Sequence, residues 1–446
     1  MAERVVGHLP PDHPLSPQLA FGGLGRLAQS LVMYPERSLW EADTESLPRP
    51  LAQFRRRMRA FAEAELAPRA LAADAAPHPP VGELTPPARE LLEVAARAGL
   101  LSDLLPRPFG SQNPLLLAQP LALPAALKTE ELAAVDGGLM LLLSATALGV
   151  APIVLSGLRA IRRFVVPAFA ECAEGRPHVF AYAITEPGGG SDVEDGHGAR
   201  SYVPGVVARR AAGGYRLSGR KVYISGGDIA KTIVVFAALE GEGMESWTAF
   251  VVRQPSDGLT VVRTELKMGM RASGAAEVLL EDAFVPRDHV LVGERRGWAL
   301  NRAVLNMSRI PVAGMGVGFA RGATETALSF ARDYRLGRRR LVDYQHVQLE
   351  LARMVADTAA ARSMVWAAAR RKQAVQHEAA AAKQFATDVA RRVCTRAMDL
   401  LGNHAVRHDG RVEKAYRDAR LTQIFEGTNE INRLAMIEDL QHELAP

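Results

Sequence analysis

A single carboxylate close to the C-terminus, Glu426, stands in a setting that suits a general base. It follows an apolar pair at 424–425 and precedes Gly427 in the stretch QIFEGTNEI. A carboxylate in an apolar pocket holds its proton more tightly than one in water, so it is better poised to remove a proton near neutral pH. Alone, such a glutamate is more often the end of a helix beside a turn. Three further segments give it chemical meaning.

A glycine-rich segment, TEPGGGSD at 185–192, follows the β-rich run HVFAYAI. Its three glycines allow a backbone to approach a flat or charged ligand closely, and the Ser191 hydroxyl adds a donor for phosphate. A glycine turn between strands is the commoner meaning of GGG alone. The segment is not the dinucleotide fingerprint G-x-G-x-x-G, because that spacing is absent and no helix is expected to follow.

An aromatic and a hydroxyl side chain lie two residues apart in KVYISGG at 221–227. Alternation along a strand puts Tyr223 and Ser225 on the same face, where they could cover one face of a flat ring and bond to its edge. A half-buried tyrosine in a sheet is the more frequent alternative. The fourth segment, KMGMRAS at 267–273, precedes the β-rich run VLLEDAFVP and says little by itself.

Composition narrows the class of protein. With 446 residues, more than one compact core is expected, and 48% hydrophobic with 23% charged residues is typical of a soluble globular protein. The net charge of +5 is too small to indicate nucleic acid, but it suits a phosphate-bearing cofactor or substrate. Two distant cysteines, Cys172 and Cys394, predict no disulfide framework and no metal site. Together with an N-terminus that lacks an apolar signal segment, they favour the cytoplasm.

The pattern along the chain predicts three domains behind an N-terminal extension. A helical region, a β-rich region and a set of long helices follow one another, and the short loops between the long helices suggest an antiparallel bundle. The predicted boundaries are 1–47 for the extension, 48–175 for the all-α domain, 176–295 for the β domain and 296–446 for the bundle. The predicted bundle helices are 298–333, 343–372, 374–404 and 412–444.

Two stretches have patterns that invite other interpretations. The segment 137–158 carries no charge and is long enough to cross a bilayer. Its glycines, proline and hydroxyl residues, with Asp136 and Arg159 close on either side, favour a buried helix pair instead. The glycines in GMGVG at 314–318 lie in a helical stretch with no strand before them, so we expect them to let helices pack closely.

In this order and at these separations, the four motifs resemble those of the acyl-CoA dehydrogenase family of flavoproteins. That family reads T-E-P-G-x-G-S-D, then K-x-W-I-T/S-N-G/A, then K-x-G-x-R-x-S/T, then Y/F-E-G-T-x-x-I-x-R. The resemblance covers roughly 51–440. It implies an α+β multidomain fold with an N-terminal helical domain, a middle β-barrel-like domain and a C-terminal four-helix bundle, which is the organisation that the pattern itself predicts.

The resemblance implies FAD-dependent α,β-dehydrogenation of an acyl thioester, in which Glu426 removes the α-proton and a hydride passes from the β-carbon to flavin N5. It implies cofactor contacts from Thr185, Gly190, Ser191, Tyr223, Ser225, Thr428 and Glu430, and substrate contacts from Asn306, Arg309 and Gly427. Tyr223 stands where the family usually has tryptophan, and Asn306 where it more often has aspartate. The implied partners are an acyl-CoA or an acyl-carrier-protein thioester and, as electron acceptor, an electron-transferring flavoprotein.

Two segments depart from the family pattern where the family reaches across a subunit interface to the adenosine diphosphate half of FAD. Tyr334 stands in place of an arginine, and Asp399 in place of the glutamine that opens Q-x-x-G-G-x-G. An aspartate near pyrophosphate would repel it. Arg335 and the arginines at 338–340 could supply charge instead, or form a solvated surface. The oligomer is therefore expected to be a homo-oligomer or a hetero-oligomer with a homologous chain.

Two other functions compete with the dehydrogenase. One is a flavin monooxygenase or oxidase on the same fold, against which the intact EGT motif speaks because oxygen-using relatives often lack that base. The other is a non-catalytic or DNA-associated homologue, or a subunit that needs a homologous partner to complete its flavin site. The positive net charge, Tyr334 and Asp399 favour this last interpretation a little.

Overall fold

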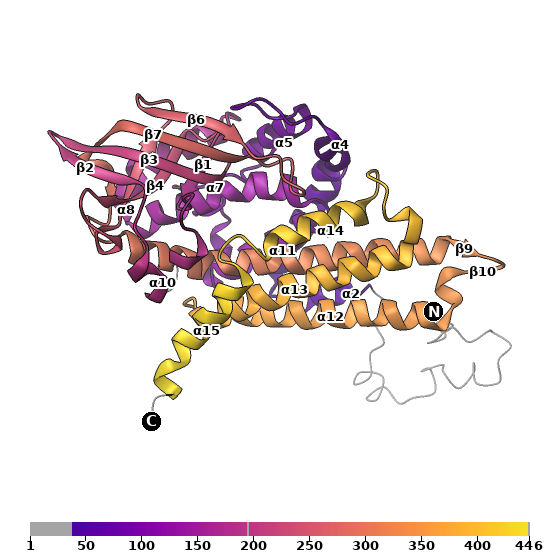
Figure 1. The fold of residues 1–446 in the computed structure, drawn as a ribbon. Coiled ribbons are helices and arrows are strands. Elements are labelled where there is room, and N and C mark those ends of the chain that lie inside the picture. Colours follow the sequence, from indigo (N-terminus) through magenta and orange to yellow (C-terminus); the bar gives the residue numbers. More distant parts are fainter. Residues whose placement is uncertain (1–37, 194–195, 445–446) are drawn as a thin grey trace. The chain divides into compact units, whose positions relative to one another are not determined.

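The computed structural model describes residues 38–193 and 196–444, which run from helices through strands to helices again (Figure 1). Contacts divide the chain into two units, residues 1–56 and 57–446. In the first unit, Ser38 caps helix α2 (Leu39–Glu45): its Oγ accepts a hydrogen bond from the Glu41 N–H at 3.3 Å, and the Glu41 carboxylate accepts one from the Ser38 N–H at 3.2 Å. Most of the predicted N-terminal extension lies outside the described residues.

Helices dominate the chain up to residue 173. They are α3 (Arg49–Phe61), α4 (Ala70–Ala75), α5 (Pro86–Arg97), α6 (Ala122–Ala133), α7 (Gly137–Leu155), α8 (Leu158–Ala160) and α9 (Val166–Ala173), with short π or 3-10 segments at Ala62–Leu66, Pro114–Ala118 and Ile161–Val165. Many of the helices in this part carry an apolar face that is buried, as in α5, where the buried residues recur at helical spacing.

The uncharged stretch forms one continuous helix, α7, and not the predicted pair of helices. Pro152 lies inside it, and the Asp136 carboxylate caps its first turn by accepting a hydrogen bond from the Leu139 N–H at 2.7 Å. Within the described residues α7 is the helix that is long and apolar enough to cross a membrane, and 61% of its most apolar window is buried in the protein. A Cβ on Gly149 would come within 2.7 Å of the Phe180 backbone, so α7 packs directly on strand β1.

A single sheet of eight strands follows. Its strands are β1 (Phe180–Ala183), β2 (Val207–Ala211), β3 (Gly214–Ser225), β4 (Thr232–Leu239), β5 (Thr248–Arg253), β6 (Leu259–Thr264), β7 (Ala275–Pro286) and β8 (Val290–Leu291). The order is β6-β7-β3-β2-β4-β5-β8, and β1 pairs with β4 in parallel. The shorter segments are Ser191–Val193, α10 (Gly196–Ser201), Met244–Ser246 and Arg287–His289.

Strand β3 is the element of this sheet that matters most for the site. It pairs antiparallel with β7, and the register shifts between Lys221 and Ile224. Tyr223 lies inside this bulge with a φ of +59°, in the left-handed region that side chains rarely adopt. The bulge turns the end of β3 and so directs Tyr223 differently from its neighbours on the strand.

The C-terminal part is a bundle of long helices. They are α11 (Gly297–Asp333), α12 (Gln345–Ala369), α13 (Gln376–Leu401), α14 (Arg411–Thr422) and α15 (Asn429–Leu444), with a small hairpin, β9 (Arg335–Leu336) and β10 (Arg339–Arg340), and 3-10 turns at Leu341–Asp343 and Gly402–His404. Helices α11, α12 and α13 run alongside one another (Figure 1). The predicted helix 412–444 is wrong in one respect, because the chain leaves the helix between α14 and α15.

Glycines on α11 allow its close packing, as predicted. A Cβ on Gly314 would come within 2.6 Å of the Ala126 carbonyl oxygen, and one on Gly318 within 2.5 Å of the Glu130 carbonyl oxygen, both on α6. Gly316 meets the backbone of α13 in the same way. Helix α11 therefore touches α6 and α13 backbone to backbone, which fixes its position between the N-terminal helices and the bundle.

Candidate functional site

Glu426 lies in the turn that separates α14 from α15. Its φ is +55° and that of Gly427 is +78°, so two consecutive residues are left-handed. A left-handed conformation costs a residue with a side chain roughly 1–2 kcal/mol. Helix α14 ends at Thr422, and these two left-handed residues separate it from α15, so the segment predicted as one helix is two. Surrounding hydrogen bonds must hold the glutamate in this conformation.

The Glu426 carboxylate is held by α11. The Ser308 Oγ donates a hydrogen bond to Glu426 Oε2 at 2.6 Å. Burial raises the pKa of Glu426, while the Ser308 hydrogen bond and the positive charges of Lys383 and Arg309 act in the opposite direction. On balance the pKa of Glu426 is raised, although the residue is only partly buried and its neighbours are polar. The group is thus suited to take up a proton.

The peptide that joins Gly427 to Thr428 is fixed at both of its polar ends. Its carbonyl oxygen accepts hydrogen bonds from Lys383 Nζ at 2.6 Å and from Asn432 Nδ2 at 2.9 Å. Its N–H donates to Ser191 Oγ at 3.0 Å. Because Ser191 belongs to the TEPGGGSD segment, the structure brings two of the four sequence motifs into direct contact. The Thr428 Oγ1 accepts from the Ile431 N–H at 3.2 Å and so caps α15.

The glycine-rich segment is anchored by its own glutamate. Glu186 is buried and forms an ion pair with Lys221 at 2.8 Å, and it accepts a hydrogen bond from the Tyr202 hydroxyl at 2.6 Å. The Tyr202 ring covers Gly189, where a Cβ would come within 2.5 Å of Cζ. Burial lowers the pKa of Lys221 to about 8, although the Glu186 carboxylate favours its charged form. Glu186 and Lys221 thus hold the shape of the segment.

The residues around this segment fit a flat, phosphate-bearing cofactor. Thr185 accepts a hydrogen bond through its carbonyl from the Val222 N–H at 3.0 Å, so the glycine-rich segment adjoins the end of β3. There, Tyr223 exposes 65% of its surface while its neighbour Ile224 is buried. A Cβ added to Gly190 would meet only the Thr185 side chain, at 3.5 Å. An exposed aromatic ring beside an open glycine backbone matches what a flavin requires.

Some predicted cofactor residues make few contacts. Ser225 is partly buried, and Glu430 is exposed on the first turn of α15. Neither they nor Tyr223 form side-chain hydrogen bonds with other residues of 38–193 and 196–444. Their predicted roles toward a cofactor stay predictions.

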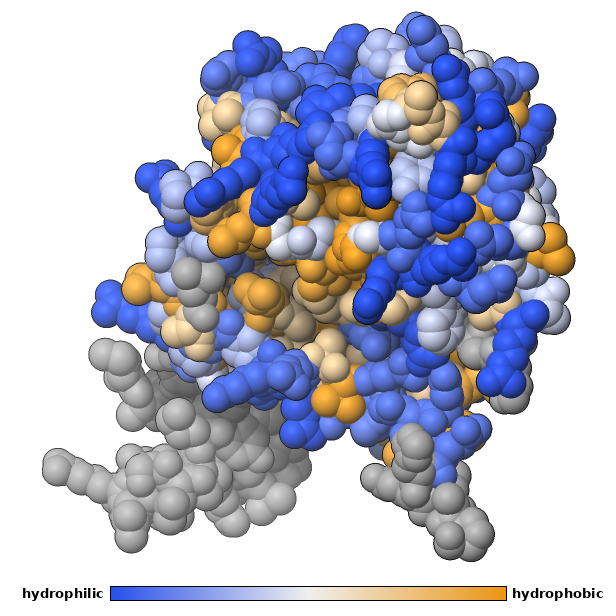
Figure 2. Space-filling view, turned by 90° about the vertical axis from the view of Figure 1, so that its left-hand side faces the viewer, coloured by the Kyte–Doolittle hydropathy of each residue, from blue (hydrophilic) through white to orange (hydrophobic). Residues whose placement is uncertain are grey.

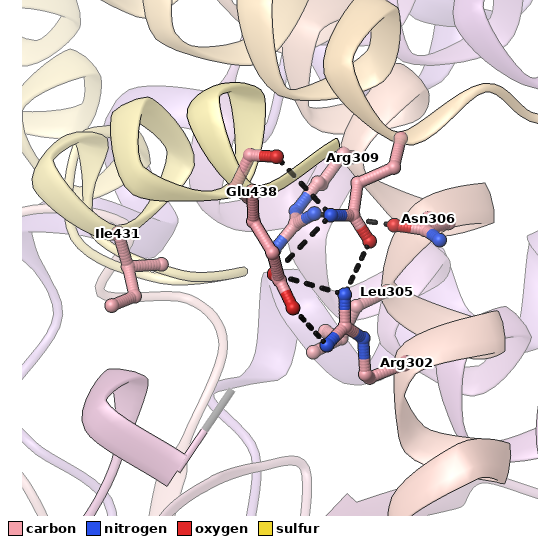
Figure 3. A pocket seen from close by; sticks show the side chains of 8 residues that line it. Arg302, Leu305, Asn306, Arg309, Ile431 and Glu438 are labelled. Atoms are coloured by element: carbon pink, nitrogen blue, oxygen red, sulfur yellow. Dashed lines mark hydrogen bonds and ion pairs between the residues drawn. The ribbon is translucent and has the colours of Figure 1, made fainter. Parts of the chain in front are cut away.

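Asn306 and Arg309 line a pocket between α11, α13 and α15. The Arg309 Nη1 donates to Asn306 Oδ1 at 3.2 Å. Figure 3 shows Arg302 facing Glu438 beside them, and these two side chains form two hydrogen bonds of 2.9 and 3.0 Å. The remaining lining residues are Leu305, Gln376, Ile431 and Ala435. Two arginines against one carboxylate leave the pocket with a positive balance that suits an anionic group.

The surface of the protein also offers an apolar hollow. Figure 2 shows a hollow with an apolar floor on a face that is otherwise mostly hydrophilic. Apolar surface set in a concavity is the usual setting for a ring system or an acyl chain.

The two segments that depart from the family pattern meet in the structure. Tyr334, at the end of α11, stacks on Phe330 with ring centroids 4.8 Å apart, and His404 lies 5.1 Å from Tyr334. Asp399 is exposed on α13. In the hairpin, Arg340 forms an ion pair with Asp343 at 2.9 Å. An aromatic cluster therefore surrounds Tyr334, at the position where the family pattern has an arginine.

Three residues of the site were not predicted from the sequence. They are Ser308, Lys383 and Asn432. Ser308 lies between the predicted residues Asn306 and Arg309 and directly precedes Arg309. Lys383 directly follows four alanines in the run AAAAKQFA, and a lysine in so alanine-rich a stretch was the available signal. Asn432 follows the EGT motif on the helix that it starts.

Three family models match this chain. They are the acyl-CoA dehydrogenase N-terminal domain over residues 51–173, the middle domain over 181–283 and the C-terminal domain over 295–441. Among curated proteins, the probable acyl-CoA dehydrogenase FadE25 of Mycobacterium tuberculosis (strain ATCC 25618 / H37Rv) is 31% identical over 401 residues, which are 88% of this chain and 96% of that protein. The cyclohexane-1-carbonyl-CoA dehydrogenase of Geobacter metallireducens is 31% identical over 395 residues, which are 87% of this chain and 96% of that protein.

Solved structures agree with these matches. Butyryl-CoA dehydrogenase from Megasphaera elsdenii has a TM-score of 0.79 at 28% identity and covers 89% of this chain and 99% of its own. An acyl-CoA dehydrogenase from Bacillus anthracis complexed with FAD has a TM-score of 0.76 at 25% identity, over 90% of this chain and 68% of its own. A chain from a structural study of the electron transferring flavoprotein of Acidaminococcus fermentans has a TM-score of 0.78 at 29% identity, over 88% of this chain and 98% of its own. The predicted resemblance and fold class are confirmed.

Proposed function

Because the chain belongs to the acyl-CoA dehydrogenase family, we propose that it oxidises an acyl thioester to its α,β-unsaturated form with Glu426 as the base. The observation that carries this proposal is the carboxylate of Glu426, whose pKa is raised by burial and whose position is fixed by Ser308. FAD, when bound, supplies the acceptor for the hydride that leaves the β-carbon. We assign the contacts with FAD to the glycine-rich segment, Tyr223 and Ser225.

Glu426 takes the α-proton on its carboxylate. An α C–H beside a thioester is a weak acid, so the negative charge that develops on the thioester oxygen must be stabilised by hydrogen-bond donors. We assign one donor to the Glu426 N–H, which makes no other backbone hydrogen bond within residues 38–193 and 196–444. The fixed Gly427–Thr428 peptide keeps this N–H and the carboxylate in a constant relation.

The positive pocket of α11, α13 and α15 is assigned to the carrier of the acyl group. Arg309 and Asn306 would contact an anionic carrier, and coenzyme A fits better than a neutral alcohol or amine because it bears phosphates. The named relatives act on coenzyme A thioesters, which supports the same assignment. An acyl-carrier-protein thioester is the alternative carrier.

The partners follow from the same chemistry. Electrons gained by the enzyme must leave it, and we propose an electron-transferring flavoprotein as the acceptor, supported by the fold shared with the structure from Acidaminococcus fermentans. We propose that the protein forms a homo-oligomer or a hetero-oligomer with a homologous chain. Both cysteines are free thiols and buried, which supports the proposed cytoplasmic location.

The substitution Glu426→Gln tests the base. It keeps the shape of the side chain and removes its basicity, so bound FAD should stay and the flavin should bleach with acyl-CoA at least ~10²-fold more slowly, the lower end of general-base contributions. Stopped-flow absorbance measures the rate, and the flavin spectrum measures the cofactor content. Glu240→Gln, at an exposed carboxylate at the end of β4, is the matched control and should bleach normally.

Three results would contradict the proposal. Bleaching at an undiminished rate in Glu426→Gln would exclude Glu426 as the base. A slow rate that came with loss of FAD would mean that the residue is structural. Colourless wild-type protein that takes up no FAD on titration would exclude a flavin-dependent reaction.

A further inference from the structure

We propose that Lys383 is a positioning residue for the base, which fixes the peptide after Glu426 and keeps the Glu426 carboxylate in its charged form. The inference rests on the proposed role of Glu426. It concerns the side chain that the bundle places beneath the EGT turn, on a helix that carries none of the four sequence motifs.

Lys383 lies in the first half of α13, and its side chain reaches the turn that carries Glu426. Its side chain is fully buried, and its Nζ donates to the Gly427 carbonyl at 2.6 Å and to Asn429 Oδ1 at 3.0 Å. Asn429 is itself bound to the next turn of α13, because its Nδ2 donates to Thr387 Oγ1 at 3.0 Å and to Asp388 Oδ1 at 2.8 Å. One face of α13 thus holds the residues that directly follow the base in this turn.

The charge of Lys383 does more than these hydrogen bonds require. Both acceptors are uncharged oxygens, which a neutral donor could also serve. A buried ammonium is costly unless negative charge lies near it. Glu426 is such a charge, and the cation of Lys383 opposes the burial that raises the pKa of that carboxylate. A cation at this place therefore has an electrostatic reason as well as a structural one.

The groups that face Glu426 come from two helices. Ser308 and Arg309 approach it from α11, and Lys383 from α13. Burial favours the protonated acid, which cannot accept the α-proton, whereas the two cations and the hydroxyl favour the carboxylate. Without Lys383 the balance moves toward the acid. The base would then be fully ionised only at a higher pH.

The variant Lys383→Met tests the charge, and Lys383→Arg tests whether charge restores the behaviour. The carbonyl infrared band of the protonated Glu426 carboxyl, identified by its loss in Glu426→Gln, reports its titration without turnover. In Lys383→Met the titration midpoint should move to higher pH by about one unit, the lower end of the effect of a nearby opposite charge. Lys383→Arg should return it toward the wild-type value. The pH at which flavin bleaching is half-maximal should move in parallel.

Thr387→Val is the matched control, because it removes an uncharged partner of Asn429 from the same face of α13. It should lower the melting temperature and leave the Glu426 midpoint unchanged. A midpoint in Lys383→Met equal to that of the wild type would overturn the proposal and leave Lys383 a structural residue. If the Met variant does not fold, Lys383→Gln keeps one donor without the charge, and an unmoved midpoint in that variant would overturn the proposal equally.

The outcome can be separated from that of the proposed function. If Glu426→Gln bleaches at the wild-type rate, Glu426 is not the base, yet the infrared midpoint still shows whether Lys383 acts on this carboxylate. A shifted midpoint with an unchanged bleaching profile would retain the electrostatic effect and reject its role in the reaction.

Discussion

Glu426 is a reactive group in a conformation that its own backbone disfavours. Its carboxylate is positioned by a hydroxyl from α11, while its main chain is held from α13 and from the glycine-rich segment. A strained residue that persists in this way at a candidate site is typical of pre-organisation, because the surroundings rather than the residue decide its geometry. The side chain can therefore meet a substrate without rearranging first.

The Ser308 hydroxyl should tune the basicity of Glu426. In Ser308→Ala the hydrogen bond to the carboxylate is lost, so burial is less opposed and the pKa of Glu426 should rise further. Because the reaction needs the charged form, the pH at which flavin bleaching is half-maximal should move upward by about one unit, as expected from loss of a hydrogen bond to a charged group. The pH dependence of bleaching measures this.

Ser308→Thr is the control for that change. Threonine keeps the hydroxyl on a helix, where its Oγ1 can occupy a similar position, so the midpoint should stay near the wild-type value. An upward shift of equal size in both variants would mean that packing, and not the hydrogen bond, sets the pKa of Glu426.

The sequence points to candidate reactive residues more readily than to the residues that support them. Glu426, Ser191 and Tyr223 could be selected without the fold because four motifs occur in the order and at the separations of one family, although each motif alone has a commoner structural meaning. Lys383 has no such signal beyond its isolation, because a lysine in a helix is normally solvated. Only the packing of α13 against the EGT turn shows that its ammonium is buried.

At the scale of elements, the site depends on where helices stop and how closely they pack. The sequence predicts one helix over 412–444, although Gly427 is the residue type that favours a left-handed helix end, and the structure has a turn at 423–428. The long helices α11, α12 and α13 were foreseen because their amphipathic or small-residue patterns are long. A single non-glycine residue with a positive φ leaves no comparable pattern.

The packing of α11 on α6 should be sensitive to a single methyl group. In Gly318→Ala the added Cβ would come within 2.5 Å of the Glu130 carbonyl oxygen, so one of the two helices must shift. Overpacking of this kind costs about 1–3 kcal/mol, and a fall in melting temperature should report it. Leu328→Ala, at an exposed position of the same helix, should change stability much less. Equal stability of Gly318→Ala and wild type would show that α6 and α11 can separate freely.

At the scale of the molecule, one carboxylate joins three parts of residues 57–446. Asp418 on α14 accepts hydrogen bonds from the Met270 N–H at 2.6 Å and from the Gly137 N–H at 3.2 Å. Lys414 binds Asp418 at 2.6 Å and Asp136 at 2.8 Å. The KMGMRAS segment, which said little as sequence, thus docks the β domain onto the bundle and the start of α7.

Removal of that carboxylate should loosen the joint. Asp418→Ala leaves the buried Lys414 with one partner fewer and two N–H groups without an acceptor, so we expect a loss of about 3–5 kcal/mol, typical of breaking a buried pair. Chemical denaturation followed by tryptophan fluorescence and by far-ultraviolet circular dichroism measures it. Asp409→Ala, at an exposed ion pair with Arg407, is the control and should be nearly neutral. A similar stability of the two variants would contradict the role of Asp418 in holding these three parts together.

The hydrogen bond between Thr428 and Ser191 has a consequence for how ligands sense one another. It ties the turn of the base to the segment assigned to the flavin, so the order of one is part of the order of the other. Coupling free energies are reciprocal. If bound flavin raises the affinity for the thioester by some factor, bound thioester must therefore raise the affinity for flavin by the same factor. Under such coupling, removal of either ligand would weaken the binding of the other.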